Sequence, residues 1–180
     1  SFDNMNTEMS LDEISNRVGL NKSTVYGILN TLVANSYIEK NLSNGKYKLG
    51  LKFLEKGTIV SGSLDLKAIV YPYIKELAYK YHVTSQINYY QNKAVYIVCR
   101  VEPPNASIVF TSRLGSKLAI HATASGKMIL ASLPMETVNE ILSSEPLTKF
   151  TNKTITEKAK LLDALNTIRK QGFSVEDEEI

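Results

Sequence analysis

The spacing of apolar residues near the start of the chain predicts two short helices separated by a tight turn. On the first predicted helix, one face carries Leu11, Ile14 and Val18. On the second, apolar residues recur every three or four positions, at Val25, Ile28, Leu29, Leu32 and Val33. A stripe with this period is typical of a helix that buries one face in a core.

Local signals mark where these two helices begin and end. Ser10 and Glu13 fit a capping box, in which the hydroxyl accepts an amide N–H three residues on and the carboxylate reaches back to the cap. Gly19 tolerates the positive φ that a tight turn needs, and Asn21 is a good cap for the second helix. Two short helices joined by a glycine turn predict a helix-turn-helix.

A β-hairpin is predicted directly after the second helix. Residues 37–42 and 46–49 have the composition of strands, and Ser43-Asn44-Gly45 separates them. Asn-Gly between two strand-like runs is a strong hairpin signal. A hairpin at this place is a wing, and it carries Lys46 and Lys48 where a phosphate backbone could lie.

The order of helix, turn, helix and hairpin indicates a DNA-binding module, because the second helix of such a motif enters the major groove. Residues 10–52 hold six basic and three acidic side chains, an excess equal to the net charge of +3 of the whole chain. The expected DNA-binding residues are Asn21, Lys22, Ser23, Thr24, Tyr26, Gly27, Asn30, Lys46 and Lys48. The same elements occur in proteins that do not bind DNA, so that alternative stays open on spacing alone.

Two further helices are predicted after the hairpin. Apolar residues between Leu51 and Val60 suggest one that ends at Ser61-Gly62-Ser63. Another runs from about residue 65 to residue 81, with Pro72 as a kink or joint. Its apolar residues at helical spacing are Leu66, Ile69, Val70, Tyr73, Leu77 and Tyr81.

Strands rich in Ile, Val and Tyr are predicted next, at residues 84–91 and 93–101, with Asn92 as the tight turn between them. A third strand is expected at residues 107–112. Successive strands after a helix indicate an α+β class rather than a parallel sheet.

Several stretches resemble a known family. LDEISNRVGLNKSTVYGILNTLVANSYIEKNLSNGKYKLG, from residue 11, resembles the DNA-binding domain of the IclR family of bacterial regulators. LGSKLAIHATASGKMILASLP, from residue 114, and residues 150–180 resemble its effector domain. The resemblance implies a winged helix-turn-helix domain at residues 1–50, a linker helix at 51–63 and a GAF-like effector domain with an antiparallel sheet at 64–180. It also implies a natural protein that extends beyond both ends of this chain.

The same resemblance implies a function. A member of this family is a ligand-responsive transcriptional regulator, with repression favoured, that acts in the cytoplasm. It binds palindromic operator DNA as a dimer or a dimer of dimers, and its effector is often a small organic acid or an aromatic compound. This chain departs from the family at Gly27, where an Arg is usual.

Residues 121–127 are the other candidate for chemistry. His121, Ser125 and Lys127 suggest a nucleophile, but the chain has no G-x-S-x-G elbow here and no phosphate-loop motif. Small residues ahead of a helix predicted at 127–132 let backbone N–H groups approach an anion. With the resemblance, the expected effector-binding residues are Thr123, Ala124, Ser125, Gly126 and His121. Two alternatives stay open, in which Ser125 caps the helix and His121 is a buried structural histidine.

Composition argues against several classes of protein, among them disulfide-bonded, metal-binding and membrane-spanning ones. Cys99 is the single cysteine, so no internal disulfide forms, and His82 and His121 lack the spacing of zinc ligands. We therefore expect no metal, no cofactor and no enzymatic activity. No apolar run approaches the ~20 residues of a membrane span, and no secretory signal is visible. The alternative function is a GAF-like protein that binds or converts a small molecule and whose N-terminal helices mediate assembly only.

Overall fold

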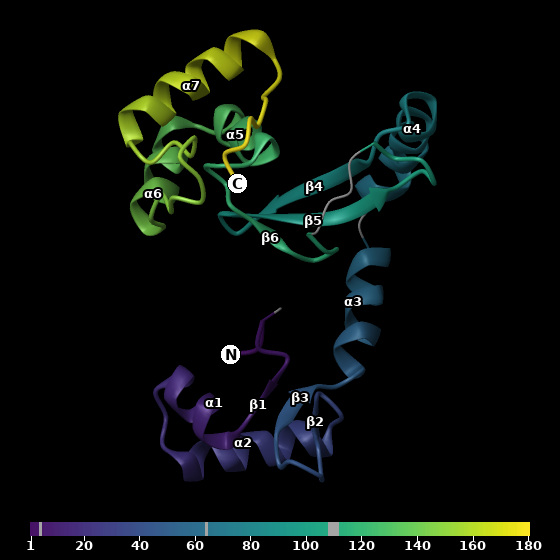
Figure 1. Cartoon of the computed structure of the whole chain (residues 1–180), viewed down its shortest axis with the longest axis vertical. Helices are drawn as coiled ribbons and strands as arrows, with labels where there is room; N and C mark the ends of the chain where they lie inside the picture. The colour runs from purple at the N-terminus through teal and green to yellow at the C-terminus, as the bar shows by residue number, and fades with distance from the viewer. Residues whose placement is uncertain (4, 64, 108–111) are drawn as a thin grey trace. The chain divides into compact units, whose positions relative to one another are not determined.

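The computed structural model describes residues 1–3, 5–63, 65–107 and 112–180, and the chain divides into two units, Ser1–Asp65 and Leu66–Ile180 (Figure 1). The elements of the first are β1 (Glu8–Met9), α1 (Leu11–Val18), α2 (Lys22–Ala34), β2 (Ile38–Lys40), β3 (Tyr47–Leu49) and α3 (Lys52–Gly62). Those that follow are α4 (Asp65–Tyr81), β4 (Ser85–Gln91), β5 (Ala94–Val101), β6 (Lys117–Leu118), α5 (Ala124–Ser132), α6 (Met135–Ser144) and α7 (Lys158–Gln171).

The core of the N-terminal unit forms where α1 and α2 pack on a small antiparallel sheet with the strand order β1-β3-β2. Each of these elements contributes to its buried apolar residues, which are Met9, Ile14, Val25, Leu29, Ile38 and Tyr47. Gly19 adopts φ +67° between the two helices, as the turn requires. The capping box of Ser10 and Glu13 is present at the start of α1. The predicted helix-turn-helix is therefore confirmed.

The burial predicted from the apolar stripes of α1 and α2 is wrong at two positions. Ile28 is 47% exposed and Val18 is 45% exposed, so neither belongs to the buried core. Both line an apolar hollow of about 390 Å³ on this unit, together with Leu20 and Phe53. Periodicity shows which face of a helix is apolar, whereas the extent of the covering surface decides how much of that face is buried.

The wing hairpin is confirmed, but it does not turn on a two-residue Asn-Gly loop. Lys40 of β2 lies opposite Tyr47 of β3, which leaves a longer loop between the strands. The Gly45 amide donates to the Asn41 carbonyl at 2.8 Å, and Gly45 adopts φ +70°. The Asn41 side chain also accepts from the Ser43 amide at 3.0 Å. These hydrogen bonds close a wider loop in which Gly45 supplies the left-handed residue.

In the C-terminal unit, β4 and β5 form a long antiparallel hairpin, and β6 pairs with β5. Asn92 and Lys93 form the turn with φ angles of 50° and 62°, and two such residues give the tight turn whose twist suits a hairpin. The α+β class with an antiparallel sheet is confirmed. The sequence predicts a third strand at 107–112, but residues 108–111 lie outside the described residues. Among the described residues, the strand that pairs with β5 on the side away from β4 is β6.

Helices cover the two ends of the β4–β5 hairpin (Figure 1). Near the turn, Val95 belongs to a core with residues of α5, α6 and α7. At the other end, Ile87 and Cys99 pack against Ile74 and Ala78 of α4, which buries the free thiol of Cys99. The sheet therefore supports two hydrophobic clusters.

Among the side chains that the structure describes, the predicted stripe of α4 matches the face that packs on the sheet only at Val70, which lies against the cluster of Ile87 and Cys99. The helix buries Ile74 and Ala78 instead, and Ala78 is fully buried. Three larger apolar residues of the stripe, Ile69, Tyr73 and Leu77, are 49–65% exposed. The small side chain of Ala78 allows close packing on the sheet, while a tyrosine hydroxyl tolerates water.

The chain after α7 is an irregular tail that docks against residues 151–154. The Thr151 hydroxyl donates to the Glu178 carbonyl and the Thr154 hydroxyl to the Glu179 carbonyl, both at 2.6 Å. Lys153 pairs with Glu178 at 3.0 Å. Within the ranges that the structure describes, no helix is both long enough and apolar enough to cross a bilayer.

Candidate functional site

The outer face of α2 is polar and lies opposite its buried stripe. Gly27 is two residues from Val25 and from Leu29, which is about 200° around an axis with 3.6 residues per turn. Val25 and Leu29 are buried, so Gly27 marks the centre of the outer face. The candidate DNA-binding residues on and before this helix are all exposed: Asn21, Lys22, Ser23, Thr24, Tyr26, Gly27 and Asn30.

Asn21 fixes the first turn of α2. Its Oδ1 accepts the Thr24 amide and the Ser23 hydroxyl, each at 2.9 Å, which confirms Asn21 as the cap. Lys22 pairs with Asp12 of α1 at 2.9 Å. Both side chains are 62% exposed, so the pair contributes roughly 0–1 kcal/mol and a phosphate can replace the carboxylate. The helix N-terminus thus combines a fixed backbone with an exchangeable lysine contact.

The wing carries both candidate lysines, Lys48 on β3 and Lys46 directly before that strand. Lys48 pairs with Glu39 across the hairpin at 3.1 Å, and each side chain is 46% exposed. Lys46 is half-buried. The pKa of Glu13 is lowered chiefly by hydrogen bonds from Ser10 and to a smaller extent by the charge of Lys46. Both lysines therefore lie among carboxylates of their own unit.

The second candidate site is the N-terminus of α5, which begins earlier than the sequence indicates. The helix starts at Ala124 rather than Lys127, because Thr123 is its cap. The Thr123 hydroxyl accepts the Gly126 amide at 3.2 Å, so the interpretation of Ser125 as the cap is wrong. In the part of the chain that the structure describes, the amides of Ala124 and Ser125 make no hydrogen bond. Two N–H groups at the positive end of the helix dipole are thus available to an anion.

Gly126 serves helix packing. A Cβ at this position would lie 2.6 Å from the Ile120 Cα and closer still to the Ile120 carbonyl oxygen. The residue is buried, and its amide is already bonded to the cap. Thr123, Ala124 and Ser125 are half-buried, but the Thr123 amide and hydroxyl are already bonded within the turn, which leaves Ala124 and Ser125 as the available part of the expected effector site.

His121 has the contacts of a structural histidine. It is 5% exposed, its Nε2–H donates to the Thr148 carbonyl at 2.9 Å, and its ring stacks on Phe150 with centroids 5.9 Å apart. None of these contacts involves Ser125, so His121 is not placed as a base for a serine nucleophile. Among the described residues, no three His, Cys, Asp or Glu side chains are grouped so that they could hold a metal ion.

Lys127 forms a buried ion pair that the sequence does not indicate. Its Nζ contacts Glu179 Oε1 and donates to the Val175 carbonyl at 2.9 Å, and the two charged side chains are 5% and 10% exposed. The partners are 52 residues apart along the chain, so no local pattern marks the contact. The pair holds the C-terminal tail against the first turn of α5.

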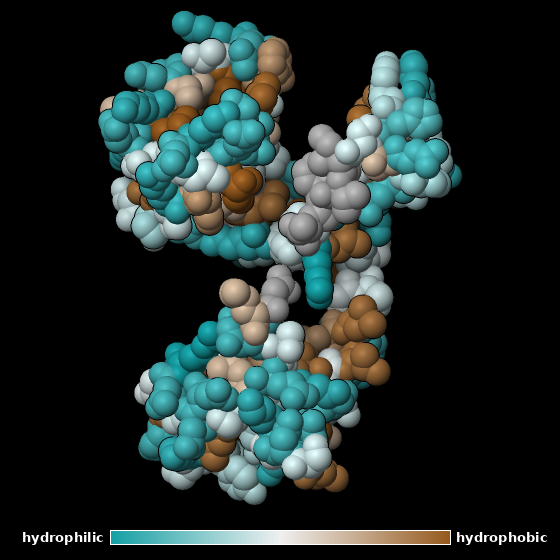
Figure 2. All heavy atoms as spheres, in the orientation of Figure 1, coloured by the Kyte–Doolittle hydropathy of each residue, from teal (hydrophilic) through white to brown (hydrophobic). Residues whose placement is uncertain are grey.

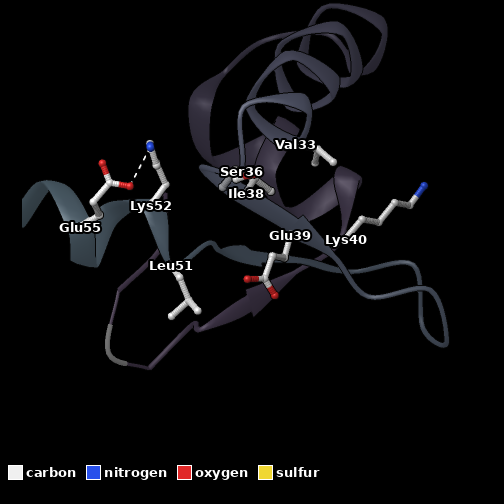
Figure 3. Close-up of a pocket in the computed structure, with 8 residues that line it drawn as sticks. All are labelled: Val33, Ser36, Ile38, Glu39, Lys40, Leu51, Lys52 and Glu55. Carbon is white, nitrogen blue, oxygen red and sulfur yellow. Dashed lines mark hydrogen bonds and ion pairs between the residues drawn. The ribbon is translucent and has the colours of Figure 1, made fainter.

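A hollow of about 730 Å³ lies beside β2 and the start of α3 (Figure 3). It is lined by Val33, Ser36, Ile38, Glu39, Lys40, Leu51, Lys52 and Glu55. Lys52 is bonded to Glu55 at 2.7 Å, as Figure 3 shows, and Glu39 is paired with Lys48. Because these charges compensate one another, the hollow favours no ligand charge and adds no third candidate site.

Comparison with known proteins identifies one family along most of the chain. The model of the IclR helix-turn-helix domain matches residues 1–42, and that of the bacterial transcriptional regulator IclR C-terminal region matches residues 58–180. The HTH-type transcriptional regulator XynR of Escherichia coli (strain K12) is 34% identical over 178 residues, 99% of this chain and 70% of that protein. The transcriptional repressor IclR of the same strain is 27% identical over 177 residues, 97% of this chain and 64% of that protein.

A solved structure extends the comparison to the fold. The crystal structure of an IclR homolog complexed with 4-hydroxybenzoate, from Microbacterium hydrocarbonoxydans, has a TM-score of 0.73 and 25% identity to this chain. The match covers 95% of this chain and 70% of that one. The relatives named here are regulators of transcription and not enzymes.

Proposed function

The chain belongs to the IclR family of bacterial transcriptional regulators, and from this premise we propose that it binds operator DNA with α2 and the wing and senses a small molecule at the N-terminus of α5. The observation that carries the proposal is the outer face of α2. That face is polar and exposed, and it sits on the second helix of a helix-turn-helix, which is the element that enters the major groove.

The proposal divides five polar residues between contacts to bases and contacts to phosphates. Ser23, Tyr26 and Asn30 reach base edges, while Lys46 and Lys48 contact phosphates from the wing. The intrachain partner of Lys48, Glu39, is no obstacle, because exposed ion pairs are weak and exchange readily. Base contacts give sequence preference, whereas phosphate contacts give affinity for any duplex.

The test of this face compares Lys46→Ala with Asn30→Ala. Lys46→Ala should weaken binding to all duplexes alike and make the salt dependence shallower by about one phosphate contact. Asn30→Ala should change which sequence is preferred. Gel-shift titrations at several salt concentrations measure both effects. Unchanged affinity and salt slope for Lys46→Ala would contradict the wing assignment.

We also propose that the protein acts as a dimer or a dimer of dimers that pairs through α3. This helix has no buried residue, and Phe53, Leu54, Ile59 and Val60 are 47–66% exposed. Figure 2 shows brown, hydrophobic atoms over α3. Exposed apolar surface of this kind marks an association site, and a two-fold dimer places two recognition helices about 34–36 Å apart in successive major grooves. The operator is then palindromic.

Light scattering tests the dimer. The double variant Leu54→Glu/Val60→Glu places two charges on the apolar surface of α3, and it should be monomeric at concentrations where the wild type is not. A wild type that is monomeric on its DNA would contradict the proposal.

The effector proposed for the α5 site is a small organic acid or an aromatic compound. The support is the pair of amides at Ala124 and Ser125, to which no described residue offers an acceptor, and the 4-hydroxybenzoate held by the homolog from Microbacterium hydrocarbonoxydans. A thermal-shift screen of small carboxylates, beginning with 4-hydroxybenzoate, identifies a ligand because binding to the folded state raises the Tm. Ser125→Leu should abolish the shift by steric volume and leave DNA binding intact. A Ser125→Leu variant that still responds at the wild-type ligand concentration would refute the site.

We further propose that the protein represses transcription and does so in the cytoplasm. A relative named as a transcriptional repressor supports the sign of regulation. A reporter gene fused to the selected operator should be silent with the protein and active without it or with the effector.

A further inference from the structure

Gly27 has no role in the folding of α2. It lies in the middle of the helix, and a Cβ at this position would meet nothing within 4 Å. Its φ is not among the positive values of the chain, so the backbone does not require glycine either. Glycine also disfavours a helix relative to alanine, because it loses more conformational freedom on folding. Folding alone would therefore favour almost any helix-forming residue at this position.

Gly27 lies on the exposed face of α2, where a binding partner rather than the protein core would contact it. It marks the centre of the outer face, about 200° from Val25 and Leu29. Ser23 and Asn30 lie one turn before and after it on that same face, and both are exposed. The missing side chain thus leaves a shallow notch of bare backbone between two polar side chains.

We propose that Gly27 sets sequence specificity by letting the backbone of α2 come into direct contact with the edges of the operator base pairs. The inference rests on the proposed function, in which this face enters the major groove. A side chain at position 27 would hold the helix axis away from the base pairs. With glycine, the short side chains of Ser23 and Asn30 reach the bases, and an Asn carboxamide can bond N6 and N7 of adenine together.

Asn30 is suited to this role. Among the described residues, its carboxamide makes no hydrogen bond and is available to a base. Tyr26 and Thr31 flank the notch on either side, and the Thr31 hydroxyl is turned back to the Gly27 carbonyl at 3.2 Å. The floor of the notch is therefore helix backbone, with its polar groups satisfied inside the helix.

The experiment uses Gly27→Ala and Gly27→Leu in the whole chain. The probes are the duplex that the wild type selects from a random-sequence library and a scrambled duplex of the same composition. Gly27→Ala should raise the Tm and weaken binding to the selected duplex by about ten-fold or more, the size of one lost base contact. Gly27→Leu should weaken it further. Binding to the scrambled duplex should stay within two-fold, roughly, since phosphate contacts are kept.

Asn16→Ala is the matched control. Asn16 is exposed on α1 of the same unit, and alanine should again raise the Tm through helix propensity. It should leave both affinities unchanged. The inference is overturned if Gly27→Ala binds the selected duplex like the wild type, or if it loses affinity for both duplexes equally. If the wild type selects no duplex at all, the proposed function itself fails, and the inference falls with it.

Discussion

The first turns of α2 and α5 are built alike and placed differently. Asn21 caps α2 and Thr123 caps α5, and in each case a side-chain oxygen accepts the amide three residues on. The turn after Asn21 is exposed except for Val25, which faces the core. In the turn after Thr123, by contrast, Gly126 and Lys127 are buried. The same capping device therefore serves an exposed surface in one unit and a packed interior in the other.

This difference in burial suits the two helices to different modes of binding, proposed to be DNA binding for α2 and ligand binding for α5. The exposed turn of α2 offers side chains, which can be exchanged without loss of packing. In the proposed function, the turn of α5 offers two backbone amides at the edge of a core, so binding of the proposed ligand depends on the same contacts that hold the fold. Substitutions on the exposed face of α2 should therefore change binding with little effect on stability, whereas substitutions of the buried Gly126 and Lys127 of α5 should change both.

Lys127→Met gives the largest expected effect. It leaves Glu179 buried without its partner, and removing one member of a buried pair costs about 3–5 kcal/mol. The control is Lys22→Met, which removes an exposed pair worth roughly 0–1 kcal/mol. Urea unfolding of both variants measures the difference. Equal losses would show that the two turns do not differ in burial as described.

Gly126→Ala and Gly27→Ala are the same chemical change, but we expect the first to lower the free energy of unfolding and the second to raise it. At Gly126 the new methyl group meets the Ile120 backbone, and overpacking of this kind costs about 1–3 kcal/mol. At Gly27 it enters open space, and the helix gains about 0.5–1 kcal/mol. The unfolding free energies of the two variants test the contrast. A stabilised Gly126→Ala variant would mean that the contact between α5 and Ile120 is looser than it is here.

Removal of either helix cap should lower the stability of the fold less than the substitutions above. Asn21→Ala removes one hydrogen bond to a helix amide, at a cost of about 1 kcal/mol. Thr123→Ala should cost more, because the Thr123 hydroxyl also donates to the Ala119 carbonyl at 2.9 Å in a half-buried place. Thermal unfolding of the two variants ranks the caps. The reverse order would contradict the claim that burial makes the α5 turn the more sensitive one.

The smallest expected effect is a pH dependence at the start of α1. The pKa of Glu13 is lowered, chiefly because its carboxylate accepts the Ser10 amide. A carboxylate with a lowered pKa stabilises the fold above its unfolded pKa of about 4.3, and that contribution is lost as pH falls through the lowered folded value. The Tm of the wild type should thus exceed that of Glu13→Gln near neutral pH, and the gap should close in acid. If the difference in Tm between the wild type and Glu13→Gln persisted in acid, the Glu13 charge would not be its cause.

Local rules were enough for much of the chain. The capping box, the positive φ of Gly19, the Asn21 cap and the turn at Asn92 each involve residues within a few positions of one another. Hydrogen-bonding and φ preferences at that range do not depend on the rest of the molecule. The family resemblance rests on the same kind of contiguous pattern, and for that reason the helix-turn-helix and the wing were predictable.

The tertiary structure decided which of several apolar faces is buried and which distant groups meet. α4 packs on the sheet through Ile74 and Ala78, which lie outside the predicted stripe, together with Val70 from it. Lys127 and Glu179 come together across 52 residues. Gly126 is tight and Gly27 is open although both lie in helices. Sequence spacing records the conformation of the chain near each residue, whereas burial and long-range pairing depend on what the rest of the chain brings against it.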